Sequence, residues 1–458
     1  MVHYWYSSER VLLLTSESLE HTQGCLHRFL CFRCFLLYCM GKKEYTEIIT
    51  GIDIGSTAIR VAVGQYTPKN NALGGDIHIL GTADVRSSGV QKGTIVSIEE
   101  AVSALSHVLE EVERLIGVPV EHAWVGISGT QILSQQSHGV IAVAKTDGEI
   151  SEEDVDRVVD AAQTVAAPLN YEVIHVLPRA YSVDGQTGIK DPVGMTGVRL
   201  EVDAQIIYGA TPHLKHITKA IYRTGIEIDD LVLSVMAAAN TVLTPEQKDL
   251  GVMMVDIGGS TTTIAVFENG NMLHTAVIPI GSNHITNDLA LGLQTSIDVA
   301  EKIKIMHGQC GTKGIGKKDT IDLSEFGLPD HIISKKFVAE IIAARVIELF
   351  EKIDDELLTL QRRALLPAGV VLCGGGAKLY DIIDVAKMVF QMNASYGFAS
   401  GIRSATDTIN DLSFTSAIGL IRWGAEMRSG QEKATKFSLP GGKAAMDNMR
   451  KVFKFLIP

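Results

Sequence analysis

Apolar and polar residues follow regular patterns along the chain from about residue 48 onward. Residues 48–63 form two apolar runs around a Gly-Ser-Thr turn, which predicts two strands joined by a tight turn. Residues 97–116 carry apolar side chains three or four positions apart, and Ser97 with Glu100 forms a capping box. The ordered part of the chain is therefore expected to begin with a hairpin followed by a helix.

Further strands and helices are predicted by the same patterns as far as about residue 425. We expect short strands at residues 123–128, 140–144, 171–177, 198–207, 228–233 and 370–372. We expect helices at residues 151–165, 214–223, 235–243, 287–307, 335–364, 377–392 and 415–423. Strands that alternate with helices favour an α/β fold. A chain of 458 residues exceeds what one hydrophobic core usually supports, so we expect more than one domain.

One strand-turn-strand motif occurs twice. The polar and glycine positions of the two copies are Asp53, Gly55, Ser56 and Thr57, then Asp256, Gly258, Gly259, Ser260 and Thr261. A carboxylate at the end of a strand can hold Mg²⁺ through water. Glycine lets the backbone approach a phosphate, and turn N–H groups and hydroxyls can donate to its oxygens. Two such hairpins that face each other could hold the phosphates of one nucleotide from both sides.

Two weaker motifs follow in the second half of the chain. An apolar strand enters the turn Gly374-Gly375-Gly376, with Lys378 just beyond, and a glycine turn between strand and helix is a geometry that contacts nucleotides. Glu301 and Lys304 lie three residues apart on one face of a predicted helix. Taken alone, this second motif is equally well explained as a surface ion pair.

The order of these motifs resembles that of the actin, Hsp70 and sugar-kinase superfamily. Within it, the chain is most similar to the FtsA family of bacterial cell-division proteins, over about residues 46–458. The resemblance rests on residues 51–57, 125–129, 250–261, 300–304 and 374–379 and on the C-terminal helix. It implies an α/β, two-lobed actin-like (ribonuclease H-like) fold with a small α+β insertion domain.

The resemblance also implies that the motifs bind ATP and Mg²⁺. Asp53 and Asp256 would hold Mg²⁺ through water, and the two hairpin turns would contact the phosphates. Glu301 and Lys304 would contact the ribose and adenine. The three glycines from Gly374 would lie against the adenosine, with Lys378 in the same site.

The family's domain order can be placed on this sequence. The first lobe would comprise residues 46–129 and 210–243, completed by about 400–425, and the insertion domain residues 130–209. The second lobe would comprise residues 244–399, followed by a linker at 427–442 and an amphipathic helix at 443–458. Residues 1–45 are an atypical extension, and we expect the functional protein to begin at Met40. The alternative for this extension is half of a zinc site at Cys31-x-x-Cys34.

The residue at the start of the helix before the second hairpin departs from the superfamily pattern. Many relatives place Glu or Gln there to orient the attacking water, whereas Ser234 falls at this position in our chain. Serine is a poor base, so general-base assistance would be weak. We therefore expect ATP binding with at most slow hydrolysis, and we assign no catalytic residue.

The C-terminal segment has the pattern of a membrane-surface helix. Its predicted membrane-binding residues are Met446, Met449, Arg450, Lys451, Val452, Phe453, Lys454 and Leu456. An apolar face with basic flanks suits an anionic membrane, although packing against the core is the alternative. The net charge of −12 disfavours nucleic acid as a partner. The six cysteines do not form the pattern of a secreted disulfide framework, so we expect a reducing cytoplasm.

These observations predict an adaptor for cell division and septum formation. The protein would bind the C-terminal tail of the tubulin-like FtsZ, tether the FtsZ ring to the cytoplasmic face of the inner membrane at the division site, and recruit later division proteins. It would also form head-to-tail polymers with itself. The alternatives are an ATP-binding scaffold for pilus assembly in the same superfamily and a small-molecule kinase on the same fold.

Overall fold

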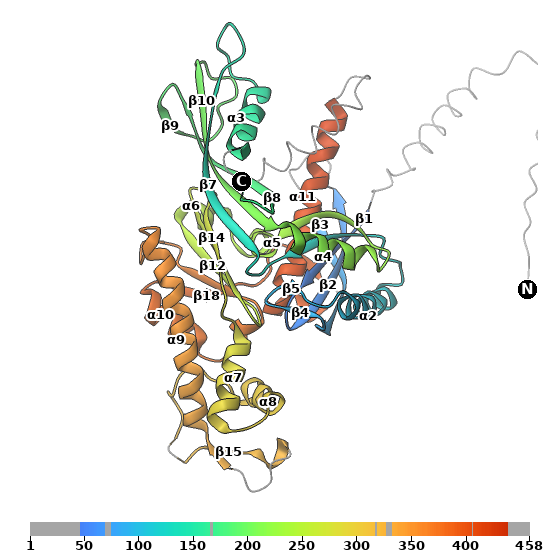
Figure 1. The fold of residues 1–458 in the computed structure, drawn as a ribbon, viewed down its shortest axis with the longest axis vertical. Coiled ribbons are helices and arrows are strands. Elements are labelled where there is room, and N and C mark those ends of the chain that lie inside the picture. The colour runs from blue at the N-terminus through green and yellow to red at the C-terminus, as the bar shows by residue number, and fades with distance from the viewer. Residues whose placement is uncertain are drawn as a thin grey trace, which may run out of the picture. The chain divides into compact units, whose positions relative to one another are not determined.

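The computed structural model describes residues 46–68, 75–164, 168–316, 318–326, 332–404 and 406–437, with side chains described to residue 429. The predictions for residues 1–45, including the Met40 start and the zinc alternative, lie outside the described residues. The same holds for the predicted membrane-binding helix at 443–458. The described chain contains two open sheets and a smaller inserted sheet (Figure 1).

The first sheet has six strands in the order β11-β6-β1-β2-β3-β19. Its strands are β1 (Glu47–Ile54), β2 (Ala58–Pro68), β3 (Gly75–Arg86), β6 (His122–Ile127), β11 (Glu227–Leu233) and β19 (Arg403–Ser404). β1 and β2 form the first predicted hairpin, in which Asp53 pairs with Arg60 across the strands. β6 runs parallel to β1, and β11 runs parallel to β6. A short hairpin of β4 (Val90–Gln91) and β5 (Thr94–Ile95) lies outside this sheet.

The second sheet repeats the strand order of the first, as β14-β13-β12-β17-β18. Its strands are β12 (Val252–Ile257), β13 (Thr262–Glu268), β14 (Asn271–Ile278), β17 (Val370–Cys373) and β18 (Ala394–Tyr396). In both sheets an antiparallel three-stranded unit is extended by two parallel strands. The repeated motif in the sequence is therefore part of a repeated five-stranded arrangement.

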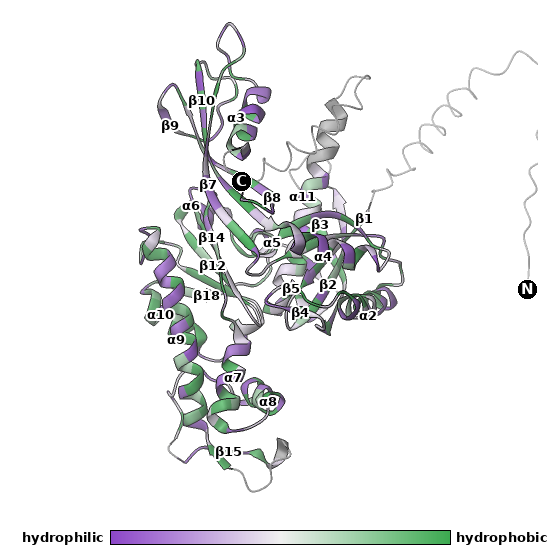
Figure 2. Cartoon of the chain, in the orientation of Figure 1, coloured by the Kyte–Doolittle hydropathy of each residue, from purple (hydrophilic) through white to green (hydrophobic). Residues whose placement is uncertain are grey.

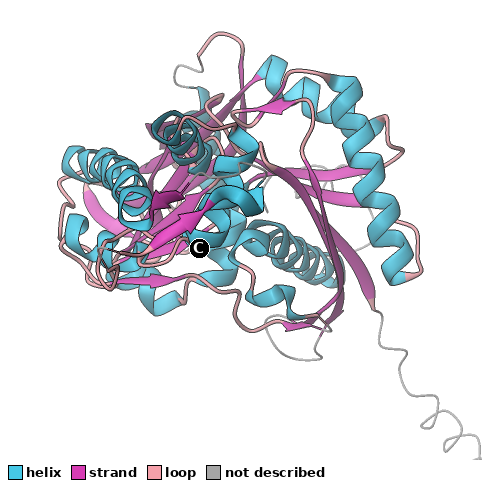
Figure 3. Ribbon diagram, turned by 90° about the horizontal axis from the view of Figure 1, so that it is seen from below, coloured by secondary structure: helices cyan, strands magenta, loops and turns pink. Residues whose placement is uncertain are grey.

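Helices surround both sheets (Figure 3). In the first lobe, α2 (Ile98–Ile116) and α4 (Thr211–Tyr222) pack on each other, and α11 (Thr415–Phe437) packs on β1, β2 and β6. α5 (Ser234–Val242) packs along α11 and contacts strands of both sheets. The second lobe contains α7 (Ser282–Leu293), α8 (Ile297–His307), α9 (Lys335–Thr359) and α10 (Ile382–Phe390). The remaining elements are α6 (Pro245–Leu250), β15 (Thr320–Asp322), β16 (Ile332–Ser334) and 3-10 turns at 323–326, 375–378, 407–410 and 412–414.

The inserted sheet has its own hydrophobic core. Its order is β7-β10-β8-β9, with β7 (Ile132–Ala142), β8 (Tyr171–Val183), β9 (Gln186–Ile189) and β10 (Arg199–Ala210). α3 (Glu152–Thr164) covers it and contributes Val158 and Val159 to a core separate from those of the two lobes. The hydrophobic residues of Figure 2 lie along the strands and on parts of the helices such as α9.

Several predicted elements differ from the observed ones. The helix expected at 287–307 is two helices, because Gln294 adopts left-handed backbone angles and Ser296 caps α8. The helix expected to reach residue 364 ends at Thr359, and that expected at 377–392 is a 3-10 turn followed by α10. β3 and β14, the third strand of each sheet, were not predicted.

The largest difference concerns the predicted linker. Residues 427–437 continue α11 as far as Phe437 instead of forming a linker, and the rest of that segment lies outside the described residues. The polar composition of the segment is compatible with a helix, because Gly430 is the single glycine in residues 427–437 and no proline interrupts them.

A cavity between the two aspartate hairpins

The two predicted phosphate hairpins have the same turn geometry. The Gly55 N–H donates to the Ala58 carbonyl at 3.2 Å, and the Gly258 N–H donates to the Thr261 carbonyl at 3.0 Å. A Cβ atom at either glycine would lie 2.7–2.8 Å from the accepting carbonyl, closer than real side chains approach. Glycine is therefore required at this position of both turns for a local steric reason.

The two hairpin turns also lie against each other. A Cβ atom added at Gly259 in the second turn would lie 1.8 Å from Oγ1 of Thr57 in the first. The carbonyls of Gly258 and Gly259 accept from the N–H groups of Ser282 and Asn283, which begin α7. The start of α7 is thereby held against the second turn.

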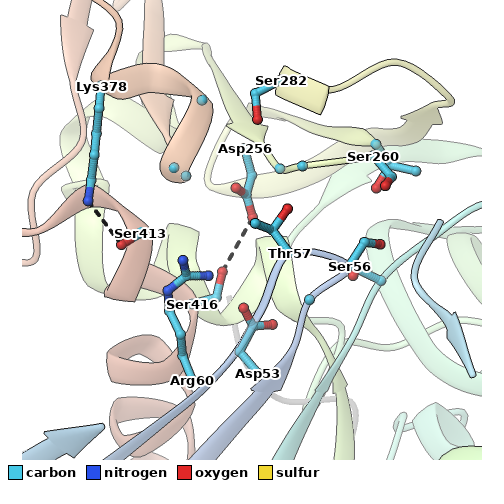
Figure 4. Close-up of a pocket in the computed structure, with 18 of the residues that line it drawn as sticks. Asp53, Ser56, Thr57, Arg60, Asp256, Ser260, Ser282, Lys378, Ser413 and Ser416 are labelled. Carbon is cyan, nitrogen blue, oxygen red and sulfur yellow. Dashed lines mark hydrogen bonds between the residues drawn. The ribbon is translucent and has the colours of Figure 1, made fainter. Parts of the chain in front are cut away.

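A cavity of about 440 Å³ is lined by both turns and by elements from the two lobes (Figure 4). It brings together every residue that the sequence predicted to bind nucleotide. These are Asp53, Gly55, Ser56, Thr57, Asp256, Gly258, Gly259, Ser260, Thr261, Glu301, Lys304, Gly374, Gly375, Gly376 and Lys378. A volume of this size falls within the usual range for small-molecule sites.

Each hairpin aspartate accepts a hydrogen bond from the start of a central helix. Asp53 Oδ1 accepts from the Ser234 hydroxyl at 3.0 Å, and Asp256 Oδ2 accepts from the Ser416 hydroxyl at 3.3 Å. Ser234 is the first residue of α5 and Ser416 is the second of α11. The two halves of the site are therefore built in the same way.

The two carboxyl groups are partly buried in the wall of the same cavity, and the pKa of each is raised. Burial raises the pKa of Asp53, although Arg60 and the Ser234 hydroxyl oppose the change. Burial, followed by the charge of Asp53, raises the pKa of Asp256 to about 7, against the opposing effects of Ser416 and Arg60. A cation near the pair would stabilise both charged forms. This donor set of carboxylate and hydroxyl oxygens fits Mg²⁺ held through water.

Arg60 is a site residue that we did not predict. It lies opposite Asp53 on β2, lines the cavity, and its guanidinium lies 5.7 Å from the centre of the Phe414 ring. Its Nε is buried and has no hydrogen-bond partner among the described residues. Thr263, its counterpart opposite Asp256 in the second hairpin, also lines the cavity, so the same position of both hairpins faces the site.

Glu301 and Lys304 do not form a simple surface ion pair. Lys304 is only 7% exposed, and its Nζ lies 2.6 Å from Glu301 Oε2 and 2.8 Å from Thr286 Oγ1. Nζ also donates to the Ser282 carbonyl at 3.3 Å. The pair is therefore fixed against α7 at the edge of the cavity, with Glu301 partly exposed.

The glycine turn after β17 passes close to Asp256. Gly374 has a positive φ of 84°, and a Cβ there would lie 2.3 Å from Asp256 Oδ1. Beyond the turn, Lys378 Nζ pairs with Asp411 Oδ1 at 2.5 Å and donates to the Ser413 hydroxyl at 3.2 Å. The turn is thereby tied to the loop that leads into α11.

Two further cavity residues, Ser128 and Leu379, lie in segments on which the resemblance rests, but they were not assigned to the site. The cavity residues outside those segments are Thr263, Ser282, Ile305, Gly308, Ser413 and Ser416. Ser234, considered above only as the residue at the water-orienting position, also lines the cavity. Most are single serines or apolar residues outside any motif, so only their place in the fold identifies them.

Among the described residues, no helix is long and apolar enough to cross a membrane.

Family models and similar proteins of known family both identify this chain as similar to cell division protein FtsA. The family model "SHS2 domain inserted in FTSA" matches residues 129–208, and the model "Cell division protein FtsA" matches residues 253–419. The chain is 36% identical to cell division protein FtsA of Pseudomonas aeruginosa, covering 85% of this chain and 92% of that protein. It is 35% identical to FtsA of Bacillus subtilis, covering 86% and 87%, and 31% identical to FtsA of Escherichia coli K12, covering 84% and 92%.

The fold also resembles that of a solved structure. A chain of the "PilM-PilN type IV pilus biogenesis complex" superimposes with a TM-score of 0.61 at 14% identity, covering 82% of this chain and 98% of that one. At this identity the likeness concerns the fold alone, which is the two-lobed actin-like fold with an inserted SHS2 domain.

Proposed function

Because this chain belongs to the FtsA family of cell division proteins, we propose that it binds Mg-ATP between its two hairpins and acts as a membrane adaptor for FtsZ. The observation that carries the nucleotide proposal is the convergence of both hairpins, the glycine turn and the Glu301–Lys304 pair on one cavity. These segments lie far apart in the sequence, and the same cavity would accept a triphosphate, a ribose and a base.

The charges of the cavity support an anionic ligand that arrives with a cation. Arg60 offers a half-buried guanidinium whose buried Nε has no hydrogen-bond partner in the described part of the chain, and the turn glycines allow backbone N–H groups to approach phosphate oxygens. Asp53 and Asp256 would hold Mg²⁺ through water, and bound Mg²⁺ would neutralise phosphate charge. Lys304, together with Glu301, would contact the ribose and base from α8.

The chain's own residues favour binding over hydrolysis. Ser234 stands where a water-orienting residue is expected, and its hydroxyl already donates to Asp53 at 3.0 Å. A hydroxyl used in this way is not a base for an attacking water. We expect ATP turnover far below the roughly 1–10³ per second typical of enzymes.

The nucleotide proposal is tested by equilibrium titration of the full chain with a fluorescent ATP analogue, with Mg²⁺ and with EDTA. We expect Mg²⁺-dependent binding in the wild type and its loss in Asp256→Asn, because one of the two cavity carboxylates is removed. Asp298→Asn, an exposed acidic position at the start of α8, is the matched control and should bind as the wild type does. Unaltered binding by Asp256→Asn would overturn the assignment.

The membrane and FtsZ roles are supported by family membership and by the amphipathic pattern of residues 443–458. Co-sedimentation with anionic liposomes, with and without ATP and FtsZ, tests both. The full chain should sediment with the liposomes and carry FtsZ with it, and deletion of residues 443–458 should release it. Equal sedimentation of the truncated chain would refute the membrane assignment. If the full chain sediments with the liposomes but FtsZ does not, only the assignment of FtsZ as a partner is refuted.

A further inference from the structure

A strand of the insertion domain reaches the first lobe through a buried histidine. His175 lies on β8 and is 3% exposed. Its Nε2 accepts a hydrogen bond from the backbone N–H of Leu233 at 3.1 Å, and its ring centre lies 5.7 Å from that of Trp423 on α11. His175 therefore contacts segments of both central helices, α11 directly and α5 through the residue that precedes it.

Leu233, whose N–H donates to His175, is the residue immediately before Ser234, which lines the nucleotide cavity. Leu233 ends β11, the outermost strand of the first sheet, and its N–H is buried. A buried N–H without an acceptor is costly, and His175 supplies the acceptor. Ser234 comes next in the chain, and its hydroxyl donates to Asp53. The position of Ser234 thus depends on where His175 holds Leu233.

On the side that faces β6, away from the cavity, Ser234 has little free space to absorb a displacement. A Cβ atom added at Gly126 on the neighbouring strand would lie 2.7 Å from Ser234 Oγ and 3.1 Å from Asp53 Oδ1. Ser234 is itself 3% exposed. In packing as close as this, a shift of the backbone at Leu233 moves the Ser234 hydroxyl relative to Asp53.

The same strand is hydrogen-bonded to the second lobe. Four residues after His175, the Arg179 carbonyl accepts from Asn271 Nδ2 at 2.9 Å, and Asn271 begins β14. Elsewhere in the insertion domain, Lys190, which follows β9, makes a weaker contact, with its Nζ 3.7 Å from Asp249 Oδ1. β8 therefore touches both lobes between which the cavity lies.

We propose that His175 is a positioning residue for the nucleotide site, acting through Leu233 and Ser234 on Asp53, and that it makes nucleotide affinity depend on the attachment of the insertion domain. This inference rests on the proposed function, because it concerns the same cavity. It gives the insertion domain a route by which its own contacts change ATP binding. His175 does not touch the cavity and is not a catalytic residue.

Two replacements of His175 distinguish the effect of its hydrogen bond to Leu233 from the effect of its packing volume. Gln places an oxygen near the position of Nε2 and keeps the acceptor, whereas Leu keeps the volume and removes it. His138→Leu, at an exposed histidine of β7 in the same domain, is the control. The readouts are the dissociation constants for ATP with Mg²⁺ and with EDTA, and hydrogen exchange in a peptide that spans Leu233.

We expect His175→Leu to weaken Mg-ATP binding about tenfold, as loss of one buried hydrogen bond would do, with little change in EDTA. Exchange at Leu233 should accelerate. His175→Gln and His138→Leu should bind within about twofold of the wild type. Ser234→Ala should weaken binding in the same way, and the double variant should lose less than the product of the two effects, because both act on Asp53.

Each outcome bears on one of the two proposals. A wild type that does not bind ATP would overturn the proposed function and this inference with it. A wild type that binds, while His175→Leu binds equally well or loses affinity equally in Mg²⁺ and EDTA, would overturn the positioning role alone. If the Leu variant does not fold, His175→Asn, whose oxygen falls near Nδ1 rather than Nε2, takes its place with the same criteria.

Discussion

Gly419 of α11 allows a close approach to the backbone of α5, and its replacement by alanine should destabilise the first lobe. A Cβ atom there would lie 2.2 Å from the Ala237 carbonyl oxygen and 2.4 Å from its carbon. Ordinary contacts begin at 3.4 Å, so α5 and α11 would have to separate by about 1.2 Å. The obstacle is helix backbone, which cannot rotate away as a side chain does.

We expect Gly419→Ala to destabilise the protein, whereas replacement of glycine by alanine inside a helix usually stabilises it. In an unobstructed helix, Gly→Ala stabilises by about 1 kcal/mol. Overpacking against fixed atoms typically costs about 1–3 kcal/mol. A clash of 2.2 Å with helix backbone belongs to the upper part of this range, about 2–3 kcal/mol, so after subtraction of the helix gain we expect Gly419→Ala to lower the free energy of unfolding by about 1–2 kcal/mol. Because the starts of these helices carry Ser234 and Ser416, Mg-ATP binding should also weaken.

Urea unfolding followed by tryptophan fluorescence measures the effect where it arises, since Trp124 and Trp423 both belong to the core of the first lobe. Gly292→Ala in α7 is the matched control. Its nearest obstacle, at 2.7 Å, is Cδ1 of Ile341, the mobile end of a side chain. The control should be neutral or slightly stabilised. A Gly419→Ala variant as stable as this control would refute the argument from helix contact.

Three further predictions concern the site and its surroundings. Gly374→Ala should weaken Mg-ATP binding more than tenfold in an equilibrium titration, because the new Cβ would clash with Asp256 and the residue has a positive φ. Gly311→Ala is the control and should bind as the wild type does, because its Cβ would meet nothing closer than 3.8 Å. Lys378→Met should weaken nucleotide binding several-fold by releasing Asp411, yet change the urea midpoint little, because the half-exposed ion pair is worth at most about 1 kcal/mol. Burial, with a smaller effect of His216, lowers the pKa of His213 to about 4 from 6.5, so the unfolded chain binds the proton first as pH falls. Stability should therefore decline between pH 6.5 and 4, by up to about 3 kcal/mol, and His213→Leu should flatten this decline in urea titrations at successive pH values.

Most of the candidate site could be predicted from the sequence because its turns obey local rules. The strand, the aspartate and the glycine of each hairpin are adjacent in the chain, and Gly55 and Gly258 are required by contacts within four residues. Arg60 was missed although it is near Asp53 in sequence, because a charged residue in a strand gives no sign of which face it occupies. The break between α7 and α8 was missed because the apolar spacing continues across Gln294.

The sequence by itself determined the two turns, the strands that carry them and the chemistry that each turn offers. Only the tertiary structure decided that Gly259 would lie against Thr57, that Ser234 and Ser416 would each meet an aspartate more than 150 residues away, and that His175 would hold the residue before Ser234. The physical reason is that turn geometry depends on the backbone angles of a few neighbouring residues. These long-range contacts depend instead on how whole sheets and helices pack, and no local pattern of residues specifies that packing.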